Sequence, residues 1–244
     1  MIREKLKEGK TSLGGWIQLA NTDVAEMMGD AGFDWVCIDM EHSPITRSDL
    51  PDLFRAITLG GTSPFCRIRL PEPDLAVEAL EAGAEGIIVP NVVDAYQLRE
   101  IKNMMHYAPK GFRGLGYCRG NMYGKYLKQH LMMNPLLVPM IENASAIPSL
   151  PYICREGIDA LFIGSYDLSA SIGKAGDFDC PEFKSAIDQI KYYAKEYNVP
   201  LGIHQVAPDR LEMLQKEEDG YQFIAYSADI VMIQTCLRDM LPNL

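Results

Sequence analysis

The chain has 244 residues, of which 33 are acidic and 23 basic, and its net charge of −10 argues against nucleic acid or an anionic membrane as a partner. With 48% hydrophobic residues it can bury a large core, enough for one α/β barrel or two smaller domains. No Pro/Gly/Ser-rich linker and no run of charge divides it, so we expect a single domain over residues 1–244.

A short sequence pattern recurs along the chain. In each copy a polar helical end is followed by Gly, one residue, a polar residue and an apolar run, and the copies lie around Gly32, Gly83, Gly157 and Gly220. A glycine just past a helix end supplies the left-handed backbone that other residues resist. The apolar run after it has the length of a strand. Helices and strands therefore alternate, which is typical of a mostly parallel sheet.

This alternation predicts eight strands, each followed by a helix. The strands are Leu13–Leu19, Trp35–Ile38, Phe65–Arg69, Gly86–Val89, Leu136–Ile141, Ala160–Ile163, Leu201–His204 and Phe223–Tyr226. The helices are Thr22–Ala31, Ser48–Leu59, Pro73–Ala82, Asp94–His106, Ala144–Arg155, Pro181–Tyr197, Pro208–Glu218 and Ala228–Met240. Eight such units in about 250 residues match a TIM (β/α)8 barrel, the α/β fold that we expect. A doubly wound open sheet is the alternative, but no G-x-G-x-x-G follows the first strand.

The connection Tyr107–Pro135 is too long for an ordinary loop between strand and helix, and connections of this length usually carry function. It contains Arg113 and Arg119. From the sequence, each arginine could be solvated, could bind an anion, or could meet another subunit.

Two acidic residues follow predicted strands. Glu142 ends the run Leu136–Ile141, and Asp167 comes shortly after Ala160–Ile163. In a parallel barrel both carboxylates lie at the carboxyl-end rim, where such folds place their chemistry. Carboxylate oxygens are suitable ligands for a hard divalent cation, so we favour a metal site. The alternative is that each acid merely caps a helix.

Proton and anion chemistry is suggested on two other strands. Asp39 stands three residues before His42, where its carboxylate could accept a hydrogen bond from the imidazole and raise the basicity of the other ring nitrogen. Arg67 and Arg69 share one face of the third strand, and an arginine in the barrel mouth could bind a carboxylate or a developing oxyanion. The alternative places both arginines on the helix side. We expect His204 to be a core histidine with satisfied hydrogen bonds.

Location and redox state follow from what the sequence lacks. No apolar segment approaches the roughly 20 residues of a membrane span, and MIREKLKEGK at the N-terminus has no apolar signal region. We therefore expect a cytoplasmic location. The six cysteines are scattered without a C-x-x-C pair, so we interpret them as reduced thiols rather than as disulfides or a zinc site.

With these residues in hand, the chain resembles the HpcH/HpaI aldolase family of metal-dependent pyruvate aldolases. The resemblance covers nearly the whole chain. Its landmarks are AGFDWVCIDMEHSP, the first Arg of CRIRLPEP, EAGAEGIIVPNV, APKGFRGLG, the Glu of VPMIEN and GIDALFIGSYDLSASIG. Together these segments are far more specific than any one of them.

The resemblance implies a site and a cofactor, which is Mg²⁺, Mn²⁺ or a similar ion such as Co²⁺. The implied residues are Glu142 and Asp167 as metal ligands, Asp39 and His42 as the acid/base dyad, Arg67 for the pyruvate enolate, and Gly164, Ser165 and Tyr166 for binding the substrate, with backbone amides around Ser165 and Tyr166 taking its carboxylate. The implied assembly is a hexamer of swapped dimers that exchange C-terminal helices.

The implied reaction is cleavage of a 4-hydroxy-2-keto acid to pyruvate and an aldehyde, or the reverse, through a metal-bound pyruvate enolate. One alternative keeps the fold but uses the enolate for a condensation, or forms it by decarboxylation of oxaloacetate. Another is a barrel that binds a keto acid without turning it over.

Three positions depart from the family pattern. Met140 stands where members often have Gln, Ser165 replaces a usual Pro, and Arg69 stands where Pro is usual. These departures bear on the choice of substrate more than on the type of reaction.

Overall fold

Eight parallel strands close into a barrel in residues 2–241, the part of the chain that this computed structural model describes. Each strand pairs with the next in chain order, and the last returns to pair with the first. The strands are β1 (Ser12–Ile17), β2 (Trp35–Asp39), β3 (Ser63–Arg67), β4 (Gly86–Val89), β5 (Leu136–Ile141), β6 (Leu161–Ile163), β7 (Leu201–Gln205) and β8 (Tyr221–Ala228). The TIM barrel expected from the sequence is confirmed.

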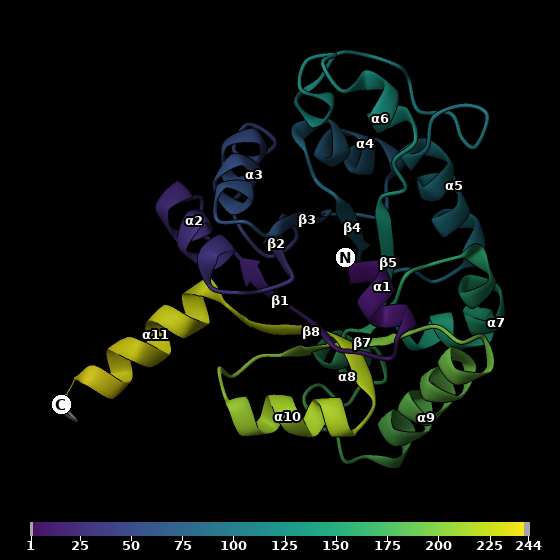
Figure 1. The fold of residues 1–244 in the computed structure, drawn as a ribbon. Coiled ribbons are helices and arrows are strands. Elements are labelled where there is room, and N and C mark those ends of the chain that lie inside the picture. The colour runs from purple at the N-terminus through teal and green to yellow at the C-terminus, as the bar shows by residue number, and fades with distance from the viewer. Residues whose placement is uncertain (1, 242–244) are drawn as a thin grey trace.

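Helices surround this barrel (Figure 1). The α-helices are α1 (Ile2–Lys7), α2 (Thr22–Asp30), α3 (Leu50–Leu59), α4 (Pro73–Ala82), α5 (Ala95–Met105), α6 (Leu127–Leu131), α7 (Leu150–Ile153), α8 (Ser165–Ser171), α9 (Pro181–Glu196), α10 (Arg210–Glu218) and α11 (Asp229–Met240). Short 3₁₀ turns are η1 (Arg119–Asn121), η2 (Ala144–Ser149) and η3 (Cys154–Glu156). Sequence reasoning missed α1, α6 and α8, because five to seven residues are too few to show a helical period.

The predicted helix Ala144–Arg155 is divided into η2, α7 and η3. Pro148 lies inside η2, and Pro151 lies in the first turn of α7. Each proline lacks the N–H that a continuous helix would use, and its ring clashes with the preceding turn. The prediction of one continuous helix over Ala144–Arg155 was therefore wrong.

Aromatic rings fill the interior of the barrel. Trp35 stacks on Phe223 with ring centroids 4.3 Å apart, and both rings are fully buried. The rings have room because a neighbouring strand offers a glycine: a Cβ on Gly14 would lie 2.1 Å from the Trp35 ring. Ile2 and Leu6 of α1 join the same apolar cluster and close the amino-terminal end of the barrel (Figure 1). Polar chemistry is thus left to the carboxyl end.

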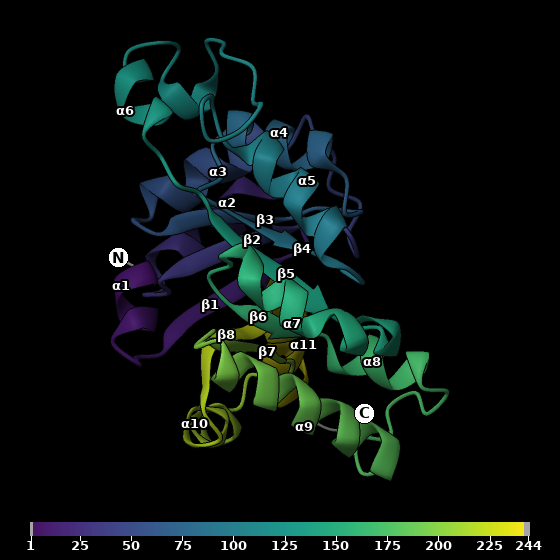
Figure 2. The same ribbon diagram turned by 90° about the vertical axis from the view of Figure 1, so that its right-hand side faces the viewer.

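The long connection between α5 and β5 folds over α4 and reaches beyond the ring of helices (Figure 2). Arg119 is tied to the chain's own fold, because its Nη1 donates to the carbonyl of Ala82 at the end of α4, 2.8 Å away. Arg113 is buried, with its guanidinium carbon 4.7 Å from the centre of the Tyr107 ring. Neither arginine is simply solvated.

The C-terminal helix α11 extends away from the barrel (Figure 1). One of its faces presents Ile230, Ile233, Leu237 and Met240, which are 41%, 43%, 53% and 74% exposed. This spacing forms an apolar stripe along a helix. Within residues 2–241 the stripe is left largely uncovered.

Two expectations about composition can be compared with the structure. All six cysteines fall among the described residues and are free thiols. Within the same residues, no helix combines the length and the apolar character needed to cross a bilayer.

Candidate active site

Asp39 and Arg67 meet inside the barrel mouth because they are paired positions of β2 and β3. Strand residues alternate in direction, so Ile38 and Cys66 pack outward against the helices while Asp39 and Arg67 point inward. The two charged groups form a bidentate pair, with Nε 2.8 Å from Oδ1 and Nη2 2.6 Å from Oδ2. Asp39 is 0% and Arg67 7% exposed. The helix-side alternative for Arg67 is therefore excluded.

Further donors surround the Asp39 carboxylate. The Gln18 side chain donates to Oδ2 at 2.7 Å, and the backbone amides of Glu41 and His42 donate to Oδ1 at 3.1 and 3.2 Å. Burial opposes ionisation of Asp39, but hydrogen bonds and charge from Arg67 outweigh it and hold the pKa of Asp39 below its usual value. Asp39 thus accepts from the backbone of His42, not from its imidazole as the sequence suggested.

The imidazole of His42 lies at the rim of the site. It is 54% exposed, and its Nε2 lies 3.7 Å from Oε2 of Glu41. It lines the cavity at the barrel mouth. A group in this position can exchange protons with both solvent and a bound ligand.

The third guanidinium nitrogen of Arg67 faces other side chains of the mouth. Nη1 lies 3.2 Å from Oε2 of Glu41 and 3.9 Å from the sulfur of Met140. The guanidinium carbon lies 4.6 Å from the centre of the Trp16 ring. Burial disfavours the charge, but Asp39 more than compensates and raises the pKa of Arg67. Arg67 therefore stays cationic.

Arg69 lies beyond the end of β3. Its guanidinium donates to the carbonyl of Met40 at 3.1 Å, and to that of Ile45. The predicted sharing of one strand face by Arg67 and Arg69 was wrong, because the strand ends two residues earlier than expected.

Glu142 is buried at the end of β5 with only one oxygen satisfied. The backbone amide of Asn91 donates to Oε1, while Oε2 is buried without a hydrogen-bond partner among the described residues. Burial, reinforced by the charge of Glu41, raises the pKa of Glu142 to about 7. A Cβ on Gly164 would lie 2.6 Å from Oε2, so this position needs glycine.

Two further carboxylates lie near Glu142. Burial raises the pKa of Glu41 to about 7, and the charge of Asp167 contributes to the raised pKa of both Glu41 and Glu142. Asp167 lies in the first turn of α8 and lines the cavity. Glu142 does not cap a helix, because Asn143 caps the turn after β5. The helix-start alternative therefore remains open only for Asp167.

A divalent cation fits this donor set. It would give the orphaned Oε2 of Glu142 a partner and would offset the crowding of negative charge. In residues 2–241 no group of three or more His, Cys, Asp or Glu side chains is placed so that it could hold a metal ion by itself. Part of the coordination would then come from water or substrate, as in catalytic sites that keep open positions.

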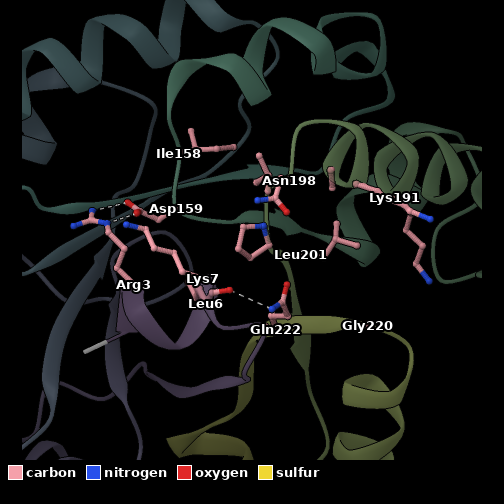
Figure 3. A pocket seen from close by; sticks show the side chains of 15 residues that line it. Arg3, Leu6, Lys7, Ile158, Asp159, Lys191, Asn198, Leu201, Gly220 and Gln222 are labelled. Carbon is pink, nitrogen blue, oxygen red and sulfur yellow. Dashed lines mark hydrogen bonds and ion pairs between the residues drawn. The ribbon is translucent and has the colours of Figure 1, made fainter.

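Two cavities mark the ends of the barrel. The cavity at the carboxyl end has a volume of about 790 Å³ and is lined by Trp16, His42, Arg67, Gly164, Asp167 and His204, among others. A second cavity of about 490 Å³ lies at the opposite end, between α1 and α9 (Figure 3). There Arg3 is paired with Asp159, whose Oδ2 lies 2.9 Å from Nη2. Of the candidate catalytic and metal-binding residues, His42, Arg67 and Asp167 line the cavity at the carboxyl end, and none lines the second cavity.

Comparison with known proteins accounts for this arrangement. Residues 12–234 match the family described as HpcH/HpaI aldolase/citrate lyase. The chain belongs to this family. It is thus an aldolase, a carbon–carbon lyase. The chain is 33% identical over 240 residues to 2-dehydro-3,6-dideoxy-6-sulfogluconate aldolase of Pseudomonas putida, covering 97% of this chain and 93% of the relative.

Two other similarities agree with this assignment. The chain is 31% identical over 246 residues to hydroxypyruvate/pyruvate aldolase of Rhizorhabdus wittichii, covering 99% of this chain and 97% of that relative. Its fold superposes with a TM-score of 0.89 on the crystal structure of a HpcH/HpaI aldolase/citrate lyase family protein from Burkholderia cenocepacia, at 29% identity over 98% and 96% of the two chains.

Sequence reasoning missed several residues of this aldolase site. Glu41 could have been predicted from the sequence, because it stands between Asp39 and His42. Gln18 could also have been predicted, since it follows β1 directly. No feature of the sequence indicated the role of the Asn91 backbone amide. For His204 the expectation of satisfied hydrogen bonds was wrong, because its Nε2 is buried without a partner within the described chain.

Proposed function

We propose that this aldolase cleaves a 4-hydroxy-2-keto acid to pyruvate and an aldehyde, or joins the two, with Mg²⁺ or Mn²⁺ as cofactor. The observation that carries the proposal is the buried, half-satisfied carboxylate of Glu142, which has Glu41 and Asp167 as anionic neighbours and a cationic Arg67 in the same mouth. The name of the Rhizorhabdus relative, hydroxypyruvate/pyruvate aldolase, supports pyruvate as one product.

Glu142 and Asp167 would hold the ion. When bound, a divalent cation polarises the keto and carboxylate oxygens of the substrate and offsets charge that develops there. The raised pKa of Glu142 follows from burial without a cation, so binding of the ion would favour the ionised carboxylate.

Arg67 would bind the oxyanion that develops at C2 of the keto acid. Its Nε and Nη2 are held by Asp39, so the fork cannot rotate, and Nη1, which faces Glu41, is the nitrogen that would donate to the substrate. A donor already oriented toward developing charge costs no reorganisation during the reaction. Asp39 would thus act through Arg67 and through the backbone of His42.

His42 would take the proton from the C4 hydroxyl. The C3–C4 bond then breaks, its electron pair moves to C3, and the aldehyde leaves. Protonation at C3 completes pyruvate. The substrate carboxylate would be bound by the backbone amides of Ser165 and Tyr166, because the first amides of a helix have no partner within it. Gly164 would keep this backbone close to Glu142.

We also propose that the apolar stripe of α11 packs against a second copy of the chain, as in the swapped dimers and hexamers that the family resemblance implies. Ile233 and Leu237 lie in the middle of the stripe and are both exposed. Replacing both by Glu should convert the oligomer to a monomer in light scattering. A monomeric parent protein would contradict this assembly.

The decisive experiment measures pyruvate release from a 4-hydroxy-2-keto acid. Chelation with EDTA should abolish turnover, and Mn²⁺ or Mg²⁺ should restore it. Glu142→Gln should resist restoration, whereas the control Glu212→Gln, which removes an exposed carboxylate of α10 beside the same cavity, should behave as the parent. Activity that survives chelation, or a borohydride-trapped lysine adduct, would contradict the proposal. Oxaloacetate decarboxylation without any aldol cleavage would favour the alternative reaction.

A further inference from the structure

Three buried side chains of the long connection Tyr107–Pro135 leave an unusual number of polar atoms without hydrogen-bond partners. Thirteen buried side-chain nitrogen and oxygen atoms in residues 2–241 have no hydrogen-bond partner. Five of them belong to Tyr107, Arg113 and His130: the Tyr107 hydroxyl, Nε and Nη2 of Arg113, and both ring nitrogens of His130. Most buried polar groups in proteins are paired, so such a concentration calls for an explanation.

The three side chains form one cluster. The Arg113 guanidinium carbon lies 4.7 Å from the centre of the Tyr107 ring, and the His130 ring meets the same ring edge-on with centroids 5.8 Å apart. Tyr107, Arg113 and His130 are 7%, 5% and 5% exposed. Water outside the protein therefore cannot satisfy their polar atoms.

The cluster has an excess of donors over acceptors. Burial raises the pKa of Tyr107, so its hydroxyl keeps its proton and can donate. Burial and the charge of Arg113 lower the pKa of His130, so its ring is neutral and carries one N–H. The guanidinium can only donate. Four of the five orphaned atoms can thus donate simultaneously, whereas only the second nitrogen of the imidazole and the oxygen of the Tyr107 hydroxyl can accept.

The charge of Arg113 has no ion-pair partner within the described chain, and the carboxylate whose charge acts on the cluster, Glu81, contributes only to the raised pKa of Tyr107. No carboxylate of the described chain lies within ion-pair distance of it, although ion pairs are formed by Arg3, Arg47, Arg55, Arg67 and Arg99. Stacking on Tyr107 compensates part of the desolvation cost. A buried cation still requires a counter-charge or acceptors for its N–H groups.

We propose that Tyr107, Arg113 and His130 form a binding site for a small monovalent anion of the size of chloride or formate. Such an ion accepts several hydrogen bonds at once and neutralises the guanidinium. The site is separate from the catalytic mouth and does not depend on the proposed reaction. An anion held there would fix Tyr107 near the end of α5 to His130 in α6, and so would order the long connection.

The test is the melting temperature of the purified protein in buffers of constant ionic strength, titrated with sodium chloride, bromide or formate against sodium gluconate. Saturable stabilisation by the three small anions, but not by gluconate, is expected. Tyr107→Phe removes one donor without changing the packing and should weaken the apparent affinity about tenfold, as expected for one lost hydrogen bond of roughly 1.4 kcal/mol. Arg113→Met should abolish the effect.

Lys125→Met is the matched control. Lys125 lies in the same connection and also stacks on a tyrosine, with its Nζ 5.0 Å from the Tyr126 ring, but it is exposed. This variant should respond to the anions as the parent does. If the small anions stabilise Tyr107→Phe and Arg113→Met as much as they stabilise the parent, the effect is general screening of charge. That result would overturn the proposed site.

Crystals grown in bromide provide a direct readout. An anomalous peak within hydrogen-bond distance of Nε or Nη2 of Arg113 is the expected result. An ordered water only, or an acceptor supplied by a neighbouring copy of the chain, would overturn the proposal.

Discussion

The Arg67 guanidinium is bound by two of its three nitrogens to the Asp39 carboxylate, and the two residues are directly paired on neighbouring strands. The pair is almost wholly buried. Asp39 therefore fixes the orientation of Arg67 and leaves Nη1 as the nitrogen nearest to Glu41 and Met140. Any change to Asp39 alters both the charge balance of the mouth and the direction in which Arg67 donates.

Asp39→Asn should lower the free energy of unfolding by about 3 kcal/mol, because it leaves a buried guanidinium without its main counter-charge. Chemical denaturation measures the change. In the double variant Asp39→Asn/Arg67→Met the uncompensated charge is gone, and part of the stability should return. The explanation is contradicted if Arg67→Met lowers the free energy of unfolding of the Asp39→Asn variant as much as it lowers that of the parent.

Arg67→Lys should reduce the rate of aldol cleavage on the order of 100-fold while the positive charge is kept. Lysine offers one ammonium and cannot bind both Asp39 oxygens while presenting a further fixed donor to the substrate. The measurement is kcat and KM for the 4-hydroxy-2-keto acid. A change confined to KM would indicate that Arg67 binds the ground state rather than the developing oxyanion.

The strands could be predicted because each is an apolar run of strand length, and β2, β4, β6 and β8 also follow a glycine that ends a helix. At Gly83 the structure shows that glycine with φ 116°, immediately after α4. The placement of Glu142 and Asp167 near a common mouth followed from the parallel topology. These features depend on residues close together in the chain.

The partner of Asp39 could not be predicted, because it depends on the register between β2 and β3. A shift of one residue would have turned Arg67 outward. The sequence offered His42 as the nearest partner, but its imidazole lies near Glu41. The burial of Arg113 could not be predicted either, since it depends on how a long connection folds back over α4.

The stability of the protein without a metal ion should fall as the pH rises from about 5 to 8. Glu142 has a pKa of about 7 in the folded chain and about 4.3 when unfolded. Between these values the folded state binds more protons, so ionisation on raising the pH destabilises it, by at most about 4 kcal/mol. Melting temperatures in EDTA measure this trend. Glu41, with the same raised pKa, acts in the same direction.

Glu142→Gln should flatten that fall in stability, because the amide stays neutral. Added Mn²⁺ should stabilise the parent at pH 8 more than at pH 5, since protons compete with the ion at low pH. The variant should gain no such stabilisation. Glu212→Gln is the control and should follow the parent at both pH values. Equal stabilisation of Glu142→Gln and the parent by Mn²⁺ would remove Glu142 from the metal site.

Gly164→Ala should weaken the affinity for Mn²⁺ at least about tenfold, as changes that displace a metal ligand commonly do. The backbone at Gly164, with φ −90°, suits alanine, but the added Cβ would lie 2.6 Å from both Cβ and Oε2 of Glu142 and would displace that side chain with its carboxylate. Calorimetry measures the affinity. Gly114→Ala is a control with open space around the new Cβ. An unchanged affinity in Gly164→Ala would show that the carboxylate moves freely.

Asp229→Ala should lower both stability and turnover, although Asp229 lies outside the catalytic mouth. Its buried carboxylate accepts from the backbone amides of Gln18 and Leu19, each at 3.0 Å, and so fixes the end of β1 from which the Gln18 side chain donates to Asp39. Loss of these bonds should cost about 2 kcal/mol in unfolding free energy. The control is Asp209→Ala, which also removes a carboxylate that accepts from two backbone amides, but at the start of α10. If Asp229 acts through Gln18, only Asp229→Ala lowers kcat measured below the unfolding transition, whereas an equal loss of kcat in both variants would reduce its role to general stability.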